Sequence, residues 1–227
     1  LRELGLELPS QTFYFEGGLL SLVKFYNQNE GQLHKNIFYV EKPARPDGRS
    51  GGEKDEINVE VAFQYIDDIT AREISYTNNT ITPEGGTHLT GFRTALTRSL
   101  NDYGRKNNLI KEKDENFTGE DVREGLTAVI SVKLRNPQFE GQTKAKLGNV
   151  EVRGAVESVF GDALQLFLEE NPDDARSIIG KVTLALRARK AAKAAKDSIL
   201  RKGALEGMTL PGKLADCQTK DADEAEL

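Results

Sequence analysis

The sequence predicts an α+β fold in which a mixed sheet packs against helices and a long helix lies near the C-terminus. Runs rich in β-branched and aromatic residues occur at 57–65, 71–77 and 126–134, and such runs are typical of strands. The segment 87–107 instead places apolar residues three or four positions apart, which is the period of an amphipathic helix. A second helical pattern, with its own start signals, covers 171–202.

The composition is that of an ordinary folded protein. Of the 227 residues, 37% are hydrophobic and 30% are charged, which argues against disorder throughout the chain. The length allows one large domain or two modest ones. With 31 basic and 36 acidic residues, the net charge is -5, so the chain lacks the strong positive charge of many nucleic-acid-binding proteins. Any contact with DNA must therefore be local.

The cysteine and histidine counts and the lengths of the apolar runs bear on disulfide bonds, metal binding and membrane insertion. The single cysteine, Cys217, cannot form an internal disulfide, and with only two histidines it gives no plausible zinc site. No run approaches the roughly 18 apolar residues of a membrane-spanning helix, and residues 1–25 lack a signal-peptide pattern. We expect a cytoplasmic protein with no metal ligand and no membrane contact. Because the chain begins at Leu1 rather than at a methionine, we also expect a fragment of a longer protein.

The N-terminal region is expected to contain a strand, a short helix and a loop. A strand-like run at Thr12–Phe15 ends in a Gly-Gly turn. A helix should follow over Gly18–Asn27, because apolar residues recur there at spacings of three and four. The stretch 42–56 is rich in proline, glycine and charge, and we expect a mobile loop there.

Several runs predict strands. Three of them follow one another, at Asn36–Val40, Ile57–Tyr65 and Ala71–Thr77, and because successive strands usually pair, we expect an antiparallel meander. Leu126–Leu134 is apolar, β-branched and bounded by turn residues, which is typical of a core strand. Val150–Val152 has the composition of a short strand.

Three longer helices are expected. The first covers Thr87–Asn107, with its first residue as N-cap, and the second covers Gly154–Glu169. The third should start with Asn171 as the cap and Pro172 in the first position, and should stop at Gly203. A helix of about 30 residues is on the order of 45 Å long, which suits a bridge between parts of a larger protein. A packed helical arm is the alternative.

The turn at 140–146 carries the strongest candidate for binding chemistry. It displays Gln142 and Lys144 soon after a predicted strand. A lysine is a compact cation suited to a terminal phosphate, and a glutamine amide can donate a hydrogen bond beside it. On spacing alone, a solvated loop is the favoured interpretation. A second Gln-Thr-Lys at 218–220 lies in an acidic tail with no strand before it, and we treat it as coincidence.

The last predicted helix is rich in basic residues, with Asp197 the only acid among them. The basic residues are Arg187, Arg189, Lys190, Lys193, Lys196, Arg201 and Lys202. Arg189, Lys193 and Lys196 fall on one face of the helix, which is compatible with contact with DNA or an adjoining domain. A solvated helical face is the favoured alternative.

The remaining polar candidates favour structural roles. No serine, cysteine or carboxylate constellation is legible around His88, and His34 carries no signal. The pairs Asp67-Asp68 and Asp173-Asp174 suit a turn and a helix start. We therefore predict no catalytic residue in this chain.

Several motifs occur in the order found in one known family. They are FEGG (15–18), TNNT (77–80), GGTHLTGFR (85–93), REGL (123–126), EGQTKAKL (140–147) and RKGALEGMTLPGKLADC (201–217). With these motifs the chain resembles, over nearly its whole length, the transducer domain of a bacterial type II topoisomerase ATPase subunit, that is gyrase B or its topoisomerase IV counterpart. The resemblance implies a split β-α-β unit with a left-handed crossover, as in a small ribosomal protein.

The resemblance also implies roles for individual residues. Gln142 and Lys144 would contact the γ-phosphate of ATP, which with its magnesium is bound mainly by a domain outside this chain. Arg93 would face DNA from the wall of a cavity that receives the transported duplex. The other expected DNA-facing positions, Arg189, Lys193 and Lys196, come from the basic pattern of the last helix and not from the resemblance. The fragment itself should lack both ATP hydrolysis and DNA cleavage.

The resemblance further implies a domain organisation and partners. We expect a transducer core at 1–170, a connecting helix at 171–203 and a linker at 204–227 towards a cleavage domain. The expected partners are DNA, a second copy of the gyrase B-type chain and the A subunit of gyrase or of topoisomerase IV, and the sequence leaves the choice between those two enzymes open. A stand-alone nucleic-acid-binding module without a nucleotide role is the main alternative, and a purely structural linker is another.

Overall fold

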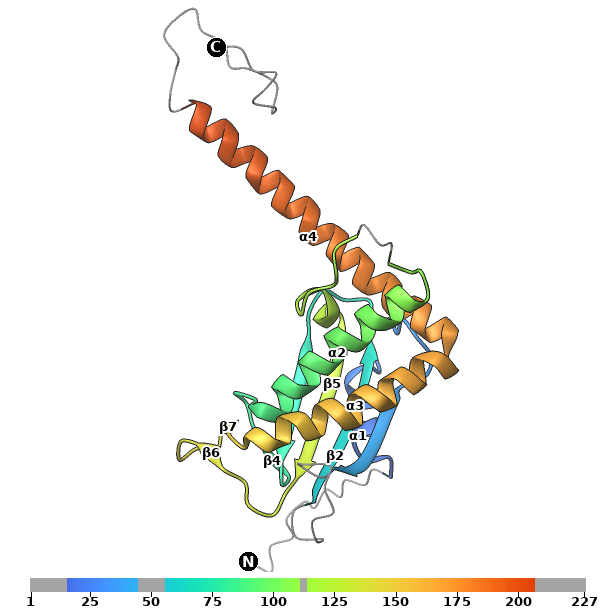
Figure 1. The fold of residues 1–227 in the computed structure, drawn as a ribbon, viewed down its shortest axis with the longest axis vertical. Helices are drawn as coiled ribbons and strands as arrows, with labels where there is room; N and C mark the ends of the chain where they lie inside the picture. The colour runs from blue at the N-terminus through green and yellow to red at the C-terminus, as the bar shows by residue number, and fades with distance from the viewer. Residues whose placement is uncertain (1–15, 45–55, 111–113, 207–227) are drawn as a thin grey trace, which may run out of the picture. The chain divides into compact units, whose positions relative to one another are not determined.

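The computed structural model describes residues 16–44, 56–110 and 114–206, with 200–206 described for the backbone only (Figure 1). The segments outside the described residues are the predicted strand at Thr12–Phe15, most of the loop at 42–56, most of the motif at 201–217 and the second Gln-Thr-Lys. Contacts divide the chain into two compact units, with the boundary between Leu186 and Arg187.

A five-stranded mixed sheet forms the centre of the first unit. Its strands are β1 Phe38–Ala44, β2 Ile57–Tyr65, β3 Arg72–Thr77, β4 Thr80–Ile81 and β5 Leu126–Lys133. Their spatial order is β1-β2-β5-β3-β4, and only the pair β3 and β5 is parallel. The predicted antiparallel meander is therefore wrong, because β5 lies between β2 and β3. This strand is buried at every position except its last, and such a strand is most stable in the middle of a sheet with both faces covered.

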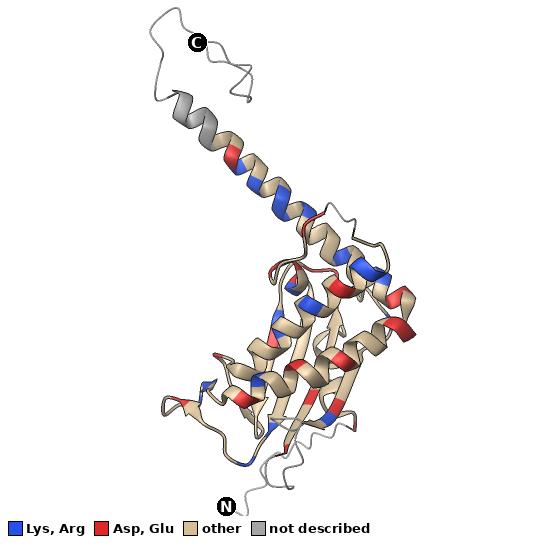
Figure 2. Ribbon diagram, in the orientation of Figure 1, with Lys and Arg blue, Asp and Glu red and all other residues tan. Residues whose placement is uncertain are grey.

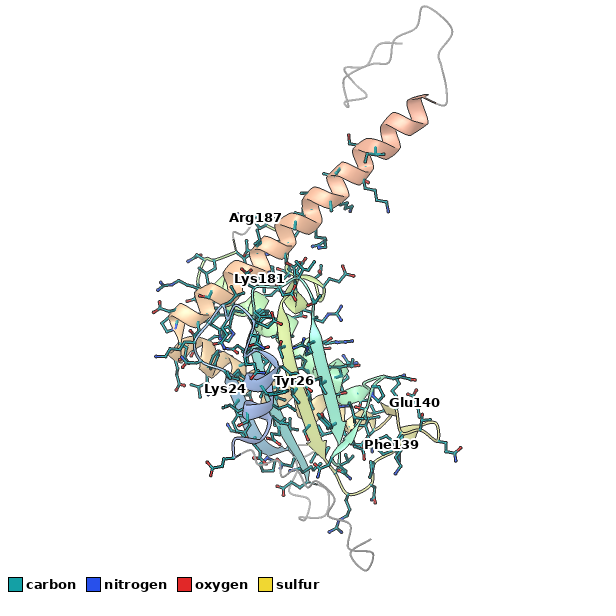
Figure 3. The ribbon with its side chains drawn as sticks, turned by 180° about the vertical axis from the view of Figure 1, so that it is seen from behind. Lys24, Tyr26, Phe139, Glu140, Lys181 and Arg187 are labelled. Carbon is teal, nitrogen blue, oxygen red and sulfur yellow. The ribbon has the colours of Figure 1, made fainter. Side chains whose placement is uncertain are left out.

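Helices cover both faces of the sheet. α2 Thr87–Lys106 and α3 Val150–Glu170 lie side by side on one face, and α1 Gly18–Tyr26 lies on the other (Figures 1 and 3). α2 connects the parallel neighbours β3 and β5, so a β-α-β crossover is present. The left hand of this crossover stays a prediction. The mixed sheet packed with helices confirms the predicted fold class.

A cluster of four phenylalanine side chains packs α2 and α3 against the sheet. The ring of Phe160 in α3 lies 5.3 Å from Phe38, 6.0 Å from Phe63 and 4.7 Å from Phe92, measured between centroids. All four side chains are almost fully buried, and aromatic pairs at these distances add to the stability gained from burial. The side of the sheet that carries these rings is therefore the main core.

Two helices begin differently from the prediction. Gly86, not Thr87, occupies the N-cap of α2, because the chain turns there with a φ of +138° that glycine adopts most readily. α3 begins at Val150, so the predicted strand at 150–152 is wrong. Val152 is buried together with Ala155 and Val156, and this spacing puts them on the inner side of a helix.

The long helix α4 spans Pro172–Glu206, so the predicted C-terminal helix and its first residue are confirmed. In its first turn, Asp174 accepts hydrogen bonds from the backbone N–H groups of Lys35 and Asn36. The helix continues past Gly203, where a stop was predicted, because glycine lowers helix propensity by only about 1 kcal/mol. None of the helices in the described part of the chain is long and apolar enough to cross a membrane.

Candidate functional site: a lysine hairpin and an arginine cluster

The predicted phosphate-binding turn is a short β-hairpin. Its strands are β6 Phe139–Glu140 and β7 Lys146–Leu147, which pair antiparallel. Gly141, with φ +79°, and Lys144, with φ +55°, have left-handed backbone conformations that tighten the loop. Residues 141–144 are exposed, so the loop presents both Gln142 and Lys144 to solvent.

The two lysines of the hairpin differ in their partners. Lys146 Nζ lies 2.9 Å from Glu140 Oε2. Lys144 Nζ lies 5.9 Å from the centroid of the Phe139 ring, at the outer limit of a cation–π contact, and within the described residues it forms no ion pair with a carboxylate. Phe139 packs against the main core at the base of the hairpin (Figure 3). The charge of Lys144 is therefore available to an anion, whereas that of Lys146 is compensated locally.

Arg93, the predicted DNA-facing residue of α2, is clamped by a carboxylate. Its Nε and Nη2 atoms donate to Glu73 Oε1 at 3.0 Å and Oε2 at 2.6 Å. Arg123 approaches the same Oε2 at 3.6 Å. The side chain of Glu73 is only 8% exposed, while that of Arg93 is 42% exposed. The hydrogen bond with Glu73 raises the pKa of Arg93 further above its usual value.

Sequence reasoning missed Glu73 and Arg123 as members of this cluster. Glu73 follows the start of β3, and Arg123 belongs to the REGL motif, which was recognised only as part of a resemblance. One carboxylate faces two guanidinium groups, so the cluster keeps a surplus positive charge. Arg93 is therefore more than an ordinary surface arginine, because it also compensates a buried charge.

The predicted basic face lies on the part of α4 that belongs to the second unit. Lys193 and Lys196 are exposed and Arg189 is half-buried. Figure 2 shows Lys and Arg along this part of the helix, and in the sequence Asp197 is the acid among them. Exposed cations at helical spacing can meet the phosphates of a nucleic acid.

Both histidines have structural surroundings. His88 is fully buried, and its Nε2 lies 3.1 Å from the hydroxyl of Thr82. Burial lowers the pKa of His88 to about 4, so the ring is neutral near pH 7. His34 Nε2 accepts a hydrogen bond from the backbone N–H of Tyr65. In the part of the chain that the structure describes, no group of His, Cys, Asp and Glu side chains could hold a metal ion.

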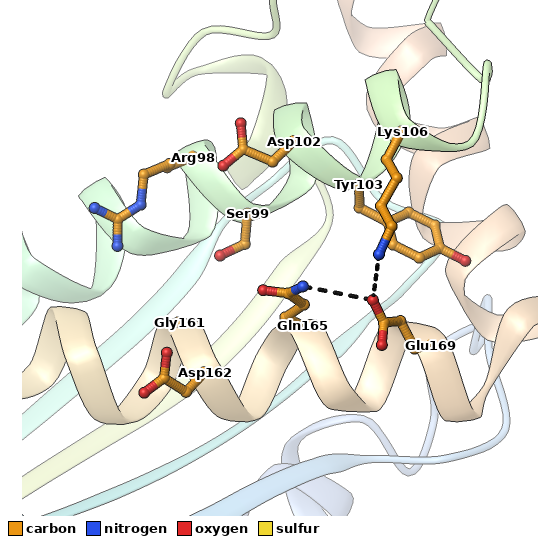
Figure 4. A pocket seen from close by; sticks show the side chains of 9 residues that line it. All are labelled: Arg98, Ser99, Asp102, Tyr103, Lys106, Gly161, Asp162, Gln165 and Glu169. Carbon is orange, nitrogen blue, oxygen red and sulfur yellow. Dashed lines mark hydrogen bonds and ion pairs between the residues drawn. The ribbon is translucent and has the colours of Figure 1, made fainter.

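A cavity of about 140 Å³ lies between α2 and α3 (Figure 4). Lys106 Nζ and Glu169 Oε1 form an ion pair of 2.8 Å at one end of it, and Gln165 donates a hydrogen bond to the same carboxylate oxygen. The cavity lining contains none of the predicted site residues. Its cations and carboxylates are mixed, and they do not select one class of ligand.

The hairpin is suited to a single contact with a nucleotide. The ammonium of Lys144 and the amide of Gln142 are both donors suited to phosphate oxygens. A ligand site buries most of the ligand surface, however, and an exposed loop of this length cannot enclose a nucleotide. The hairpin alone could therefore contact a nucleotide only if another part of the protein held that nucleotide.

Comparison of the sequence with known proteins gives one family. The sequence model of the family described as DNA gyrase B matches residues 18–198. The DNA gyrase B protein of Bacillus mycoides is 54% identical over 215 residues, which cover 95% of this chain and 51% of that protein. The DNA gyrase B protein of Clostridium acetobutylicum is 50% identical over 218 residues, which cover 96% of this chain and 33% of that protein. The chain thus spans only half or a third of these relatives.

Solved structures agree with the sequence comparison. The 43K ATPase domain of Thermus thermophilus gyrase B, in complex with an aminocoumarin, is 40% identical with a TM-score of 0.70, over 80% of this chain and 46% of that one. The topoisomerase IV ATP-binding domain of Francisella tularensis, in complex with a small-molecule inhibitor, is 32% identical with a TM-score of 0.62, over 79% of this chain and 45% of that one.

Proposed function

Because the chain belongs to the DNA gyrase B family, we propose that it is the transducer region of an ATP-dependent type II DNA topoisomerase. In this proposal it couples the binding and hydrolysis of ATP to the movement of DNA through the enzyme. The chain covers about half of one relative compared above and a third of the other, so ATP binding and DNA cleavage are assigned to other parts of a longer cytoplasmic protein. The proposed division is a core at 1–170, a connecting helix at 171–203 and a linker at 204–227.

The observation that carries the proposal is the exposed ammonium of Lys144 on a hairpin with a well-anchored base. When bound by a neighbouring domain, ATP with its magnesium supplies a terminal phosphate that is lost on hydrolysis. Lys144 donates to that phosphate and compensates its charge, and Gln142 donates beside it. Since Lys144 has no carboxylate partner among the described residues, no ion pair has to break before this contact forms.

A movement of the hairpin on phosphate binding would be transmitted to the rest of the chain. The hairpin lies against the start of α2, and the connecting helix α4 follows the core in sequence. In this proposal α4 carries the movement towards the cleavage domain. Lys144 and Gln142 would lose their phosphate contact when the terminal phosphate is absent, as it is in ADP, and the hairpin would then be released.

The experiment is Lys144→Ala in the full-length protein, assayed together with its A-subunit partner. We expect ATP-driven supercoiling or decatenation to be lost, and ATP turnover to fall by about tenfold or more, because one charge-assisted contact to the phosphate is removed. The circular dichroism spectrum should be unchanged, since the side chain is exposed. Normal ATP turnover in this variant would refute the role.

Lys146→Ala is the matched control on the same hairpin. Lys146 is a half-exposed lysine whose charge is already paired with Glu140, so this variant removes one cation from the hairpin without removing the proposed phosphate contact. It should retain nearly full ATP turnover. A loss equal to that of Lys144→Ala would mean that only the net charge of the hairpin matters.

Contact with DNA forms the second part of the proposal. Arg93 in the first unit, and Arg189, Lys193 and Lys196 in the second, are the proposed DNA-facing residues. The proposed partners are a second copy of the full-length protein and the A subunit of gyrase or topoisomerase IV. Replacing any one of these DNA-facing residues by glutamine should reduce the salt dependence of DNA binding, provided that the residue contacts a phosphate. Strong DNA binding by this chain alone, without any nucleotide effect, would instead favour a stand-alone nucleic-acid-binding module.

A further inference from the structure

We propose that Gly86 is a positioning residue for Lys144, and that its contact with Leu147 joins the hairpin to the first turn of α2. The inference rests on the proposed role of Lys144. It assigns a function to the Gly-Gly turn before α2, which has no phosphate-cradle form of its own.

Backbone contacts tie the hairpin to residues 84–86. The N–H of Glu84 donates to the carbonyl oxygen of Ala145, and the N–H of Leu147 donates to the carbonyl oxygen of Gly85, both at 3.0 Å. Gly86 and Leu147 also form a parallel bridge. Leu147 is fully buried in the main core. The residue that follows Lys144 in the chain is therefore held by the turn before α2.

Only glycine allows this close approach. A Cβ atom on Gly86 would lie 2.4 Å from the carbonyl oxygen, 2.5 Å from the nitrogen and 2.9 Å from the Cα atom of Leu147. These are backbone atoms, so they cannot rotate away. The φ of +138° at Gly86 is a second restriction on any other residue. A side chain at this position would push the base of the hairpin off the start of α2.

The same glycine also begins the helix. The carbonyl oxygen of Gly86 accepts hydrogen bonds from the backbone N–H and the hydroxyl of Thr90, both at 3.0 Å. One turn later, a Cβ on Gly91 would lie 2.6 Å from the carbonyl oxygen of Arg153 in α3, so α2 and α3 also meet closely there. The base of the hairpin and the first turns of both helices therefore pack as one body, and a displacement of Lys144 moves the part of α2 that carries Arg93.

The test compares two nucleotides on the full-length protein carrying Gly86→Ala. ADP lacks the terminal phosphate, so only a non-hydrolysable ATP analogue depends on the position of Lys144. We expect the affinity for the analogue to fall about tenfold, the effect of one charge-assisted hydrogen bond, and the affinity for ADP to stay unchanged. Adding Gly86→Ala to Lys144→Ala should cause no further loss, because both changes act on one contact.

Gly125→Ala is the matched control for backbone damage. Gly125 has a φ of +73°, and a Cβ on it would lie 2.5 Å from the carbonyl oxygen of Ile66. The backbone strain and the clash are therefore comparable to those of Gly86→Ala, but they lie away from the hairpin. It should leave the ratio of the two affinities unchanged. If Gly86→Ala does not fold, Gly85→Ala should show a smaller loss of the same kind. Gly85 also has a left-handed φ, of +69°, but the atoms nearest to a Cβ there belong to the side chain of Leu89, with its Cδ2 at 2.6 Å, and not to the hairpin backbone.

Each outcome decides between the hypotheses. Equal losses for both nucleotides, or a double variant clearly weaker than Lys144→Ala, would overturn the positioning role and leave Gly86 with a structural one. If Lys144→Ala itself leaves the ratio of the two affinities unchanged, the proposed function of Lys144 fails, and the role of Gly86 fails with it. A normal Gly86→Ala beside a defective Lys144→Ala would overturn the further inference alone.

Discussion

Lys144 and Arg93 are both cations that the sequence predicts to meet phosphate, and their surroundings are opposite. The hairpin at 139–147 exposes Lys144 and gives it no ion pair within the described residues. The β3–α2 junction, which comprises Glu73, Thr82, His88 and Arg93, places its arginine against a buried carboxylate. The first region holds its cation ready for a ligand, whereas the second already uses its cation to compensate a charge of its own.

This difference separates function from stability. A lysine that is exposed and has no carboxylate partner among the described residues can be replaced at little cost to folding, so its loss should appear in nucleotide binding and ATP-driven activity rather than in stability. A buried carboxylate that loses its arginine keeps a poorly compensated charge. A defect of an Arg93 variant in DNA handling therefore has to be separated from a defect in folding.

The largest expected effect is the acid sensitivity of the β3–α2 junction. Burial lowers the pKa of His88 from 6.5 to about 4, so the unfolded chain binds the proton first as the pH falls. The free energy of opening the junction should therefore decrease between about pH 6.5 and pH 4 and level off below, by about 3 kcal/mol in total. Hydrogen exchange of the α2 amides, corrected for the intrinsic exchange rate at each pH, measures this free energy of opening.

Variants of the two histidines identify the source of this pH dependence. Burial also lowers the pKa of His34, so this residue acts in the same direction. His88→Gln should flatten most of the pH dependence in α2, and His34→Gln should leave most of it in place. An unchanged slope in His88→Gln would contradict the assignment, whatever the absolute stability of the variant.

The next effect compares Arg93→Ala with Lys144→Ala. Removing Arg93 leaves Glu73, which is 8% exposed, with the more distant Arg123 at 3.6 Å to compensate its charge, so opening of β3 and α2 should become easier by about 2 kcal/mol. Lys144→Ala should change local opening by less than about 0.5 kcal/mol. Hydrogen exchange of the amides in β3 and α2 reports both values. Equal hydrogen-exchange protection in the two variants would show that Arg93 contributes no more to stability than Lys144 does.

The smallest effect concerns the ion pair on the hairpin itself. Glu140→Gln removes the partner of Lys146, and because both side chains are well exposed, the free energy of local opening should change by less than about 0.5 kcal/mol. Hydrogen exchange at Lys146 and Leu147 measures this change. A loss above about 1 kcal/mol, on the order of a buried hydrogen bond, would show that the hairpin depends on its ion pair rather than on its backbone contacts with residues 84–86.

The local sequence pattern was enough to predict the type and the bounds of several helices and strands. Ile57–Tyr65 is a strand with the predicted bounds, and the predicted strand at 126–134 and helix at 87–107 differ from the structure by one residue at one end. Each of these segments carries its own local signal, a β-rich apolar run in the strands and a helical spacing of apolar residues in the helix, so no information from elsewhere in the chain was needed. The start of α4 at Pro172 was likewise legible from local signals.

Strand pairing and the partners of the site residues could not be predicted in this way. The position of β5 between β2 and β3 depends on which strand gains most from burial on both faces, and that is a property of the assembled sheet. Glu73 and Arg123 are far apart in sequence, yet both belong to the environment of Arg93. The turn with Gln142 and Lys144 was a candidate from its own residues, whereas the roles of these two residues and of Arg93 were assigned from a resemblance and stay predictions.

The sequence by itself determined the α+β class, the family motifs and the lysine-bearing turn, because each is encoded in residues that are neighbours along the chain. The tertiary structure alone decided that Arg93 is clamped by Glu73 and that the backbone of Gly86 lies against Leu147. Such contacts join segments tens of residues apart, and their geometry exists only once the sheet and helices have packed. Charge compensation and close backbone approach are therefore consequences of folding that no local pattern records.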